Sequence, residues 1–201
     1  DRADRPAMSY VELQQVARDA LGQQTATAEI LSAIRRSATD LQSVLEAVVE
    51  SASRLCGAGH ISLYQVDGPL MRKVAEYGGP LTSQRVGETR PITRMSVSGR
   101  AILDRTTVHV SDYQSAEAVR EYPDVRHDTG IRTTVGIPLV REGAAIGAFT
   151  AYRIEPRSFS DREIRLLQTF ADQAVIAIEN VRLFRELEAR NRDLTESLEQ
   201  Q

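Results

Sequence analysis

The first strongly periodic segment of the chain spans residues 41–55. Its apolar residues recur at intervals of three and four, which places them on one face of a helix. These residues are Leu41, Val44, Leu45, Val48, Ala52 and Leu55. Gly57 and Gly59 follow directly, and glycine ends helices readily because it adopts left-handed backbone conformations. The pattern predicts a helix that is buried along one face and ends near residue 56.

From residue 60 the period of the apolar positions changes from 3.6 toward 2, which is typical of β-strands. Two pairs of such runs flank short turns that contain glycine, and glycine accepts the positive φ that tight hairpins require. The predicted strands span residues 60–66, 70–77, 132–140 and 144–153, with turns at Asp67-Gly68 and Glu142-Gly143. The sequence therefore predicts two antiparallel hairpins.

Shorter elements are predicted between the two hairpins. Residues 78–91 are expected to form a long loop, and residues 96–105 a short helix. A strand is expected at residues 107–110. Asp112 is a candidate N-cap for a further helix that runs to about Arg120, because aspartate accepts hydrogen bonds from the first free N–H groups of a helix.

The last segment predicts one long helix. Ser160 and Glu163 have the spacing of a capping box, and residues 161–201 contain neither proline nor glycine. At about 1.5 Å per residue such a helix is roughly 60 Å long, so its far half extends past a small domain. Its second apolar stripe has heptad spacing, which predicts a parallel dimer seam with a polar residue inside. The predicted seam is Phe184, Leu187, Asn191, Leu194 and Leu198.

These segments divide the chain into three parts. Residues 1–24 are polar and rich in glutamine, and we expect them to form an N-terminal linker helix. Residues 25–181 contain the strands and the helices that cover them, and are expected to form one α+β domain. Residues 182–201 are expected to form a C-terminal coiled-coil linker helix.

Composition excludes several functional classes. The net charge of −3 gives no excess positive charge for a nucleic-acid surface. Cys56 is the single cysteine, which rules out an internal disulfide or a zinc site built on paired cysteines, and favours a reducing compartment, the cytoplasm. No run of 18 apolar residues occurs, so no membrane span is expected.

Candidate catalytic and metal-binding residues are few. His60, His109, His127 and Cys56 lack the spacing of a metal site, so we expect no metal. Ser96 and Ser98 are better explained as helix caps than as nucleophiles, since no G-x-S-x-G motif surrounds them. The chain itself is therefore not expected to be an enzyme.

Three sequence blocks carry a resemblance to a known family. They are residues 99–112, residues 133–143 with Ile146-Gly147, and Phe159-Ser-Asp-Arg-Glu163 before the long helix. Over roughly residues 28–184 the chain resembles a GAF domain. The resemblance implies an antiparallel sheet of five or six strands with helices on both faces, long N- and C-terminal linker helices and a small-molecule pocket. It also implies a cytoplasmic signalling protein with tandem GAF modules, most often a sensor histidine kinase, sometimes a cyclase, phosphodiesterase or transcription regulator.

The sequence departs from special branches of that family. Bilin-binding members attach the pigment through a cysteine near the pocket, whereas Cys56 lies before the first strand, so no covalent bilin is expected. The GAF-like methionine sulfoxide reductases need several cysteines. The Asn-Lys, Phe, Asp-Glu signature of the cyclic-nucleotide-binding members is absent. The identity of any cofactor or ligand stays open.

Aromatic and polar residues near the implied pocket are the candidate ligand contacts, because small-ligand sites combine apolar walls with a few polar groups. Core packing explains many of these aromatics equally well. The candidates are Tyr64, Tyr77, Arg100, Val110, Tyr113, Tyr122, Val125, His127, Thr133 and Val135. The expected function is a sensory input module that forms a homodimer, binds a small molecule and controls an output domain in the same polypeptide. The alternative is a structural relay that binds no ligand.

Overall fold

The computed structural model describes residues 41–79, 81–123 and 129–199. Its centre is a six-stranded antiparallel sheet with the strand order β3-β2-β1-β6-β5-β4. The strands are β1 (His60–Asp67), β2 (Leu70–Tyr77), β3 (Thr89–Pro91), β4 (Val108–Val110), β5 (Thr133–Arg141) and β6 (Ala144–Arg153). The helices are α2 (Leu41–Cys56), α3 (Val97–Asp104), α4 (Ala116–Glu121) and α5 (Asp161–Glu199). This α+β architecture confirms the predicted fold class.

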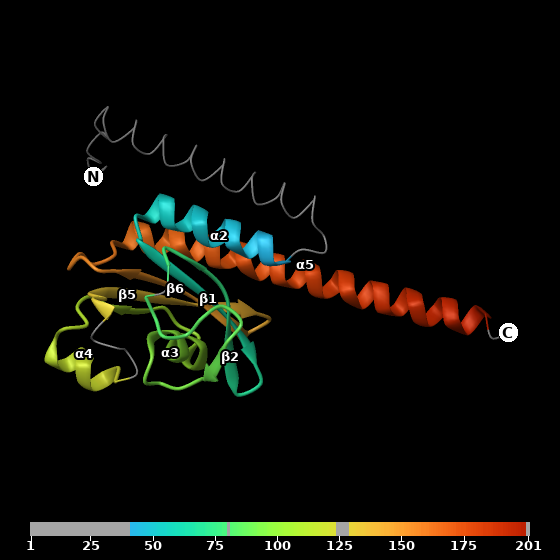
Figure 1. The fold of residues 1–201 in the computed structure, drawn as a ribbon, viewed down its shortest axis with the longest axis horizontal. Coiled ribbons are helices and arrows are strands. Elements are labelled where there is room, and N and C mark those ends of the chain that lie inside the picture. The colour runs from blue at the N-terminus through green and yellow to red at the C-terminus, as the bar shows by residue number, and fades with distance from the viewer. Residues whose placement is uncertain (1–40, 80, 124–128, 200–201) are drawn as a thin grey trace, which may run out of the picture.

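The sheet separates two layers of helices, as Figure 1 shows: α2 and α5 cover one face, and α3 lies against the other. Strand β6 contributes to both layers because successive side chains point to opposite faces of a strand. Phe149 and Ala151 belong to the main core beneath α2 and α5. Ala148 and Tyr152 belong to the smaller clusters on the α3 side. The main core therefore binds the two longer helices to the sheet.

Both predicted hairpins are confirmed. Gly68 has φ +58° in the turn between β1 and β2, and Glu142 and Gly143 have φ +49° and +80° between β5 and β6. Two successive positive φ values are those of a type I′ turn, whose twist matches that of the flanking strands.

Two local predictions are wrong. Residues 78–91 are not entirely loop, since Thr89–Pro91 pairs with β2 as strand β3. Asp112 does not cap α4; the cap is Ser115, whose side chain accepts from the N–H of Ala118. The carboxylate of Asp112 instead accepts from the Arg132 guanidinium at 3.1 and 3.2 Å and from the N–H of Gln114 at 2.9 Å. The ion pair with a residue 20 positions away outweighs the local capping role.

The long C-terminal helix is confirmed as the unbroken α5, which extends well past the globular body in Figure 1. Its predicted capping box is present, because Glu163 N–H donates to Ser160 Oγ at 3.3 Å and Ser160 N–H donates to Glu163 Oε2 at 2.8 Å. Leu187 of the predicted seam is 57% exposed. The predicted linker helix 1–24 lies outside the described residues, and the dimer seam stays a prediction.

Candidate functional site

A cavity of about 260 Å³ lies on the α3 side of the sheet. Thr150 and Tyr152 of β6 form its floor, and Ser96 to Ser98 at the start of α3 form one side. The rest of the wall comes from residues 81–84 and 88–90, and from Tyr113, Thr129 and Ile131. The cavity combines aromatic and aliphatic surface with several polar side chains, which is the usual composition of a small-molecule site.

Arg90 supplies the positive charge of this wall. Its Nη2 donates to Ser98 Oγ at 2.7 Å, and its guanidinium carbon lies 5.3 Å from the centre of the Tyr64 ring. Its Nε is buried and has no hydrogen-bond partner in the described part of the chain. Strand β3 therefore contributes a guanidinium that is held in place by α3 and β1 but is only partly satisfied.

Gln84 is held in the same wall by two backbone carbonyls. Its Nε2 donates to the carbonyl of Glu88 at 2.6 Å and more weakly to that of Met71 at 3.5 Å. Because carbonyls only accept, these contacts fix which end of the amide is the NH₂ group. The Oε1 atom is thus left buried, and it has no donor among the residues that the structure describes.

Two tyrosines meet beneath the cavity. The hydroxyl oxygens of Tyr64 and Tyr152 lie 3.4 Å apart, and one of them donates to the other. Burial raises the pKa of Tyr152, with a smaller contribution from Tyr64, so that phenol stays protonated. The two tyrosine hydroxyls carry two protons, and the hydrogen bond between them uses one. The other hydroxyl proton is therefore free of this contact and can donate a second hydrogen bond.

Of the residues predicted to contact a ligand, Tyr113 lies in the cavity wall. Tyr64 is buried behind Arg90. Tyr122 packs edge to face on Tyr113 at a centroid distance of 5.9 Å, and its hydroxyl accepts from Arg100 Nη1 at 3.0 Å. Tyr122 and Arg100 therefore support the wall from behind.

The remaining predicted contacts lie elsewhere. Tyr77 is 38% exposed at the end of β2, and Val135 is buried in the main core on the other face of the sheet. Thr133 donates its hydroxyl to the carbonyl of Ser111 at 3.0 Å, and Val110 packs in the smaller cluster. The predictions for Val125 and His127 lie outside the described residues.

Sequence reasoning missed Arg90, Gln84, Thr150 and Tyr152 as wall residues. Arg90 and Gln84 lie within residues 78–91, where the sequence predicts a loop, and no local pattern shows which way their side chains point. For Thr150 and Tyr152 the sequence does contain a signal. Side chains alternate between the two faces of a strand, so these two residues lie on the face opposite Phe149 and Ala151.

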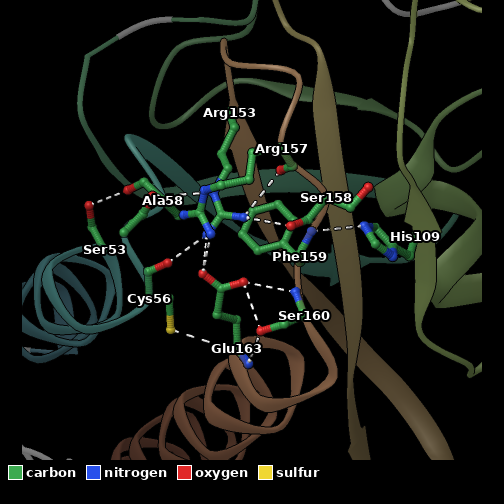
Figure 2. Close-up of polar contacts among 11 residues, drawn as sticks. Ser53, Cys56, Ala58, His109, Arg153, Arg157, Ser158, Phe159, Ser160 and Glu163 are labelled. Atoms are coloured by element: carbon green, nitrogen blue, oxygen red, sulfur yellow. Dashed lines mark hydrogen bonds and ion pairs between the residues drawn. The ribbon is translucent and has the colours of Figure 1, made fainter. Parts of the chain in front are cut away.

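The end of β6 carries a second polar cluster, on the side of α2 and α5 (Figure 2). The Arg153 side chain is 1% exposed, and its Nη2 donates to Glu163 Oε1 at 2.6 Å and to the carbonyl of Cys56 at 2.7 Å. Its guanidinium carbon lies 3.8 Å from the centre of the Phe159 ring. One buried guanidinium thus connects the end of α2, the end of β6 and the first turn of α5.

These contacts set the charge state of the cluster. Burial by itself would raise the pKa of Glu163, but hydrogen bonds from Arg153, Ser160 and Arg157 outweigh burial and lower it to about 2. Burial raises the pKa of the Cys56 thiol to about 12. Glu163 is therefore ionised and Cys56 is protonated at neutral pH.

The described residues form neither a cluster of metal ligands nor a membrane-spanning helix. Among residues 41–79, 81–123 and 129–199, no three His, Cys, Asp or Glu residues gather in a way that would hold a metal ion. Within the same ranges, no helix is both long and apolar enough to cross a bilayer.

Comparison with solved structures shows the same fold. The chain is similar to the GAF domain of an Acinetobacter phosphoenolpyruvate-protein phosphotransferase, with a TM-score of 0.67 and 14% identity over 84% of this chain and 98% of that one. It is similar to residues 122–287 of a methyl-accepting chemotaxis protein, with a TM-score of 0.63 and 26% identity over 77% and 98%. It is also similar to the free methionine-R-sulfoxide reductase of Neisseria meningitidis in complex with its substrate, with a TM-score of 0.65 and 19% identity over 91% and 99%.

A family model supplies the assignment. The model described as "GAF domain" matches residues 38–179, which is more than half of the chain and lies inside the domain predicted at 25–181. The match spans α2, all six strands and the first half of α5. The chain therefore belongs to the GAF domain family, a family of signalling and sensory modules.

Proposed function

We propose that this GAF domain is the input module of a two-component sensor histidine kinase. A small molecule in the cavity changes the relative stability of two arrangements of α5 in a homodimer, and α5 passes that change to an output domain in the same polypeptide. A cyclase, phosphodiesterase or transcription regulator as the parent protein is the alternative for the output. The proposed location is the cytoplasm.

The observation that carries this proposal is the position of β6 between the cavity and α5. Thr150 and Tyr152 line the cavity, and the next residue, Arg153, binds Glu163 in the first turn of α5. A ligand that displaces Tyr152 therefore acts on the backbone next to the buried ion pair. This is a contiguous physical connection between a binding site and a helix that leaves the domain.

The free energy needed to shift the equilibrium between the two arrangements of α5 is modest. If the ligand binds one arrangement of the paired helices a hundredfold more tightly than the other, the equilibrium shifts by about 2.7 kcal/mol. A ligand with equal affinity for both arrangements shifts nothing. The shape of the cavity therefore has to differ between the two arrangements. Strand β6 can couple the two, because it lines the cavity and also holds α5 through Arg153.

The proposed dimer uses the exposed apolar side of α5. Leu187 of the predicted seam is 57% exposed, and burying such a side chain in a heptad seam is favourable because it removes apolar surface from water. We expect Leu187→Asp/Leu194→Asp to be monomeric in multi-angle light scattering, with the far-UV circular dichroism of the domain retained. Arg185→Asp/Arg192→Asp is the control, since it places two aspartates outside the predicted seam and makes the net charge still more negative than the seam variant does, and we expect it to stay dimeric.

An unchanged dimer in the seam variant would assign association to another surface. Isothermal titration calorimetry of the wild-type chain against small acids, amino acids and nucleosides tests the ligand part of the proposal. Heat from saturable binding that is absent from a cavity-filling variant, Ser98→Phe, supports it. No binding by any compound favours the alternative function, a structural relay that passes conformational changes between neighbouring modules without a ligand.

A further inference from the structure

Within the described ranges, the cavity wall holds one cation and one carboxylate, and the two do not pair with each other. Among the described residues that line the cavity, Arg90 is the only cation, and no carboxylate of the described chain pairs with it. The carboxylate is that of Glu88, an exposed residue of the lining, and it accepts from the N–H of Arg85 at 2.9 Å. A partly buried guanidinium without an anion is unfavourable, because it loses hydration without gaining an ion pair.

The first turn of α3 adds to the positive potential. Ser96, Val97 and Ser98 line the cavity at the amino end of this helix, and the amino end of a helix carries partial positive charge. Ser98 also orients Arg90 through its 2.7 Å contact with Nη2. Two independent features thus favour a negative group at the same side of the cavity.

Two neutral groups of the wall also lack partners. The Thr150 side chain is fully buried, and its Oγ1 has no hydrogen-bond partner in the part of the chain that the structure describes. Gln84 is 7% exposed, and its Oε1 requires a donor. Buried polar atoms in native proteins are nearly always hydrogen-bonded, so these two atoms indicate a polar occupant that carries a hydroxyl or amino group.

Size and charge restrict the occupant further. At about 30 Å³ for each water, a volume of about 260 Å³ corresponds to roughly nine waters, which fits a compound of about ten non-hydrogen atoms. A phosphate carries about −1.5 to −2 charges at neutral pH, whereas the lining offers one cation and also contains the carboxylate of Glu88. A carboxylate matches a single guanidinium in charge and in planar geometry.

We propose that the cavity binds a small organic carboxylate whose anionic group pairs with Arg90 and whose hydroxyl or amino group donates to Gln84. This ligand class rests on the proposed function of the cavity as an input site. The carboxylate supplies the acceptor that Arg90 Nε lacks, and Thr150 completes the contacts from the floor.

Matched probes test the ligand class. Mandelate and benzoate are compared with mandelamide and benzamide, and with phenylphosphonate, by ligand-observed NMR titration of the full 201-residue chain. We expect each carboxylate to bind at least about tenfold more tightly than its amide, because a hydrogen-bonded ion pair is lost in the amide. Mandelate should bind more tightly than benzoate, since it carries the hydroxyl donor. Shifts of the Thr150 methyl signal locate the binding in the cavity.

Two variants assign the preference to one residue. Arg90→Gln should remove the preference for carboxylate over amide. Arg85→Gln removes an exposed arginine of the same segment and should keep it. The comparison of carboxylate with amide in the wild-type chain needs no variant, so it stands even if Arg90→Gln does not fold.

The outcomes separate the ligand class from the proposed function. Amides or phenylphosphonate that bind in the cavity as tightly as the carboxylates overturn the carboxylate assignment but leave an input site. Binding that leaves the Thr150 methyl signal unmoved overturns the assignment to this cavity. No binding of any probe up to about 10 mM overturns the carboxylate assignment, whereas saturable binding of another compound in the calorimetric titrations still supports the small-molecule input function.

Discussion

The buried pair of Arg153 and Glu163 offers the sharpest test of how the domain holds its exit helix. Replacing Glu163 by glutamine keeps the shape of the side chain and removes its charge. The Arg153 guanidinium then stays buried with carbonyl partners at Cys56, Gly57, Arg157 and Ser158 but without its counter-ion. We expect the variant to fold with a lower free energy of unfolding.

The magnitude follows from the pKa of Glu163. A decrease from 4.5 to about 2 corresponds to about 3 kcal/mol, at about 1.4 kcal/mol for each pKa unit. The side chain is 20% exposed, so solvent screening reduces this figure, and we expect a loss of about 2 kcal/mol at neutral pH. Because the pKa is lower in the folded state, the contribution is present above about pH 4.5 and is lost as the pH falls toward 2.

Urea unfolding followed by far-UV circular dichroism between pH 2.5 and 7, at one protein concentration, measures both effects. Wild type should lose about 2 kcal/mol more than Glu163→Gln as the pH falls across this range. Glu155→Gln makes the same change of charge at an exposed residue and should behave as wild type. Equal pH dependence in wild type and Glu163→Gln would refute the reasoning.

Three further predictions concern packing and reactivity. Leu45→Ala removes a fully buried side chain of α2 from the main core and should lower the free energy of unfolding by about 2–5 kcal/mol in urea titrations; a loss near zero would contradict its place in the core. Gly147→Ala should lower the melting temperature clearly, because a Cβ there would lie 2.1 Å from the Tyr64 carbonyl oxygen, whereas Gly59→Ala meets nothing within 4 Å and should change little. Because burial raises the pKa of Cys56 to about 12, its thiol should react with Ellman's reagent near pH 8 only after denaturation; rapid reaction of the native chain would show that the thiol is accessible.

Short-range patterns predicted much of this fold. The turns at Gly68 and Gly143 were predictable because tight hairpins need positive φ, and the start of α5 was predictable because Ser160 and Glu163 satisfy each other's backbone N–H groups. Each of these signals depends on residues that are close in the sequence.

Other features depended on partners that are distant in the sequence. The sequence alone favours Asp112 as a helix cap. In the folded chain its carboxylate binds Arg132, and Ser115 caps α4. Residues 89–91 become a strand because β2 offers them an unpaired edge. The candidate site is of this second kind, because Arg90 faces a cavity only after β3 pairs with β2 and Ser98 orients its side chain.

The sequence by itself determined the two hairpins, the start of the unbroken exit helix and the resemblance to the family, since periodicity, turn residues and capping residues act over a few positions. Only the tertiary structure decided which side chains line the cavity and which guanidinium is fully satisfied. Arg153 has Glu163 and four carbonyls, whereas Arg90 has Ser98 alone among its described hydrogen-bond partners. This difference arises only on folding, because the partners of each arginine lie outside the strand that carries that arginine. No pattern within a single strand or helix can therefore predict it.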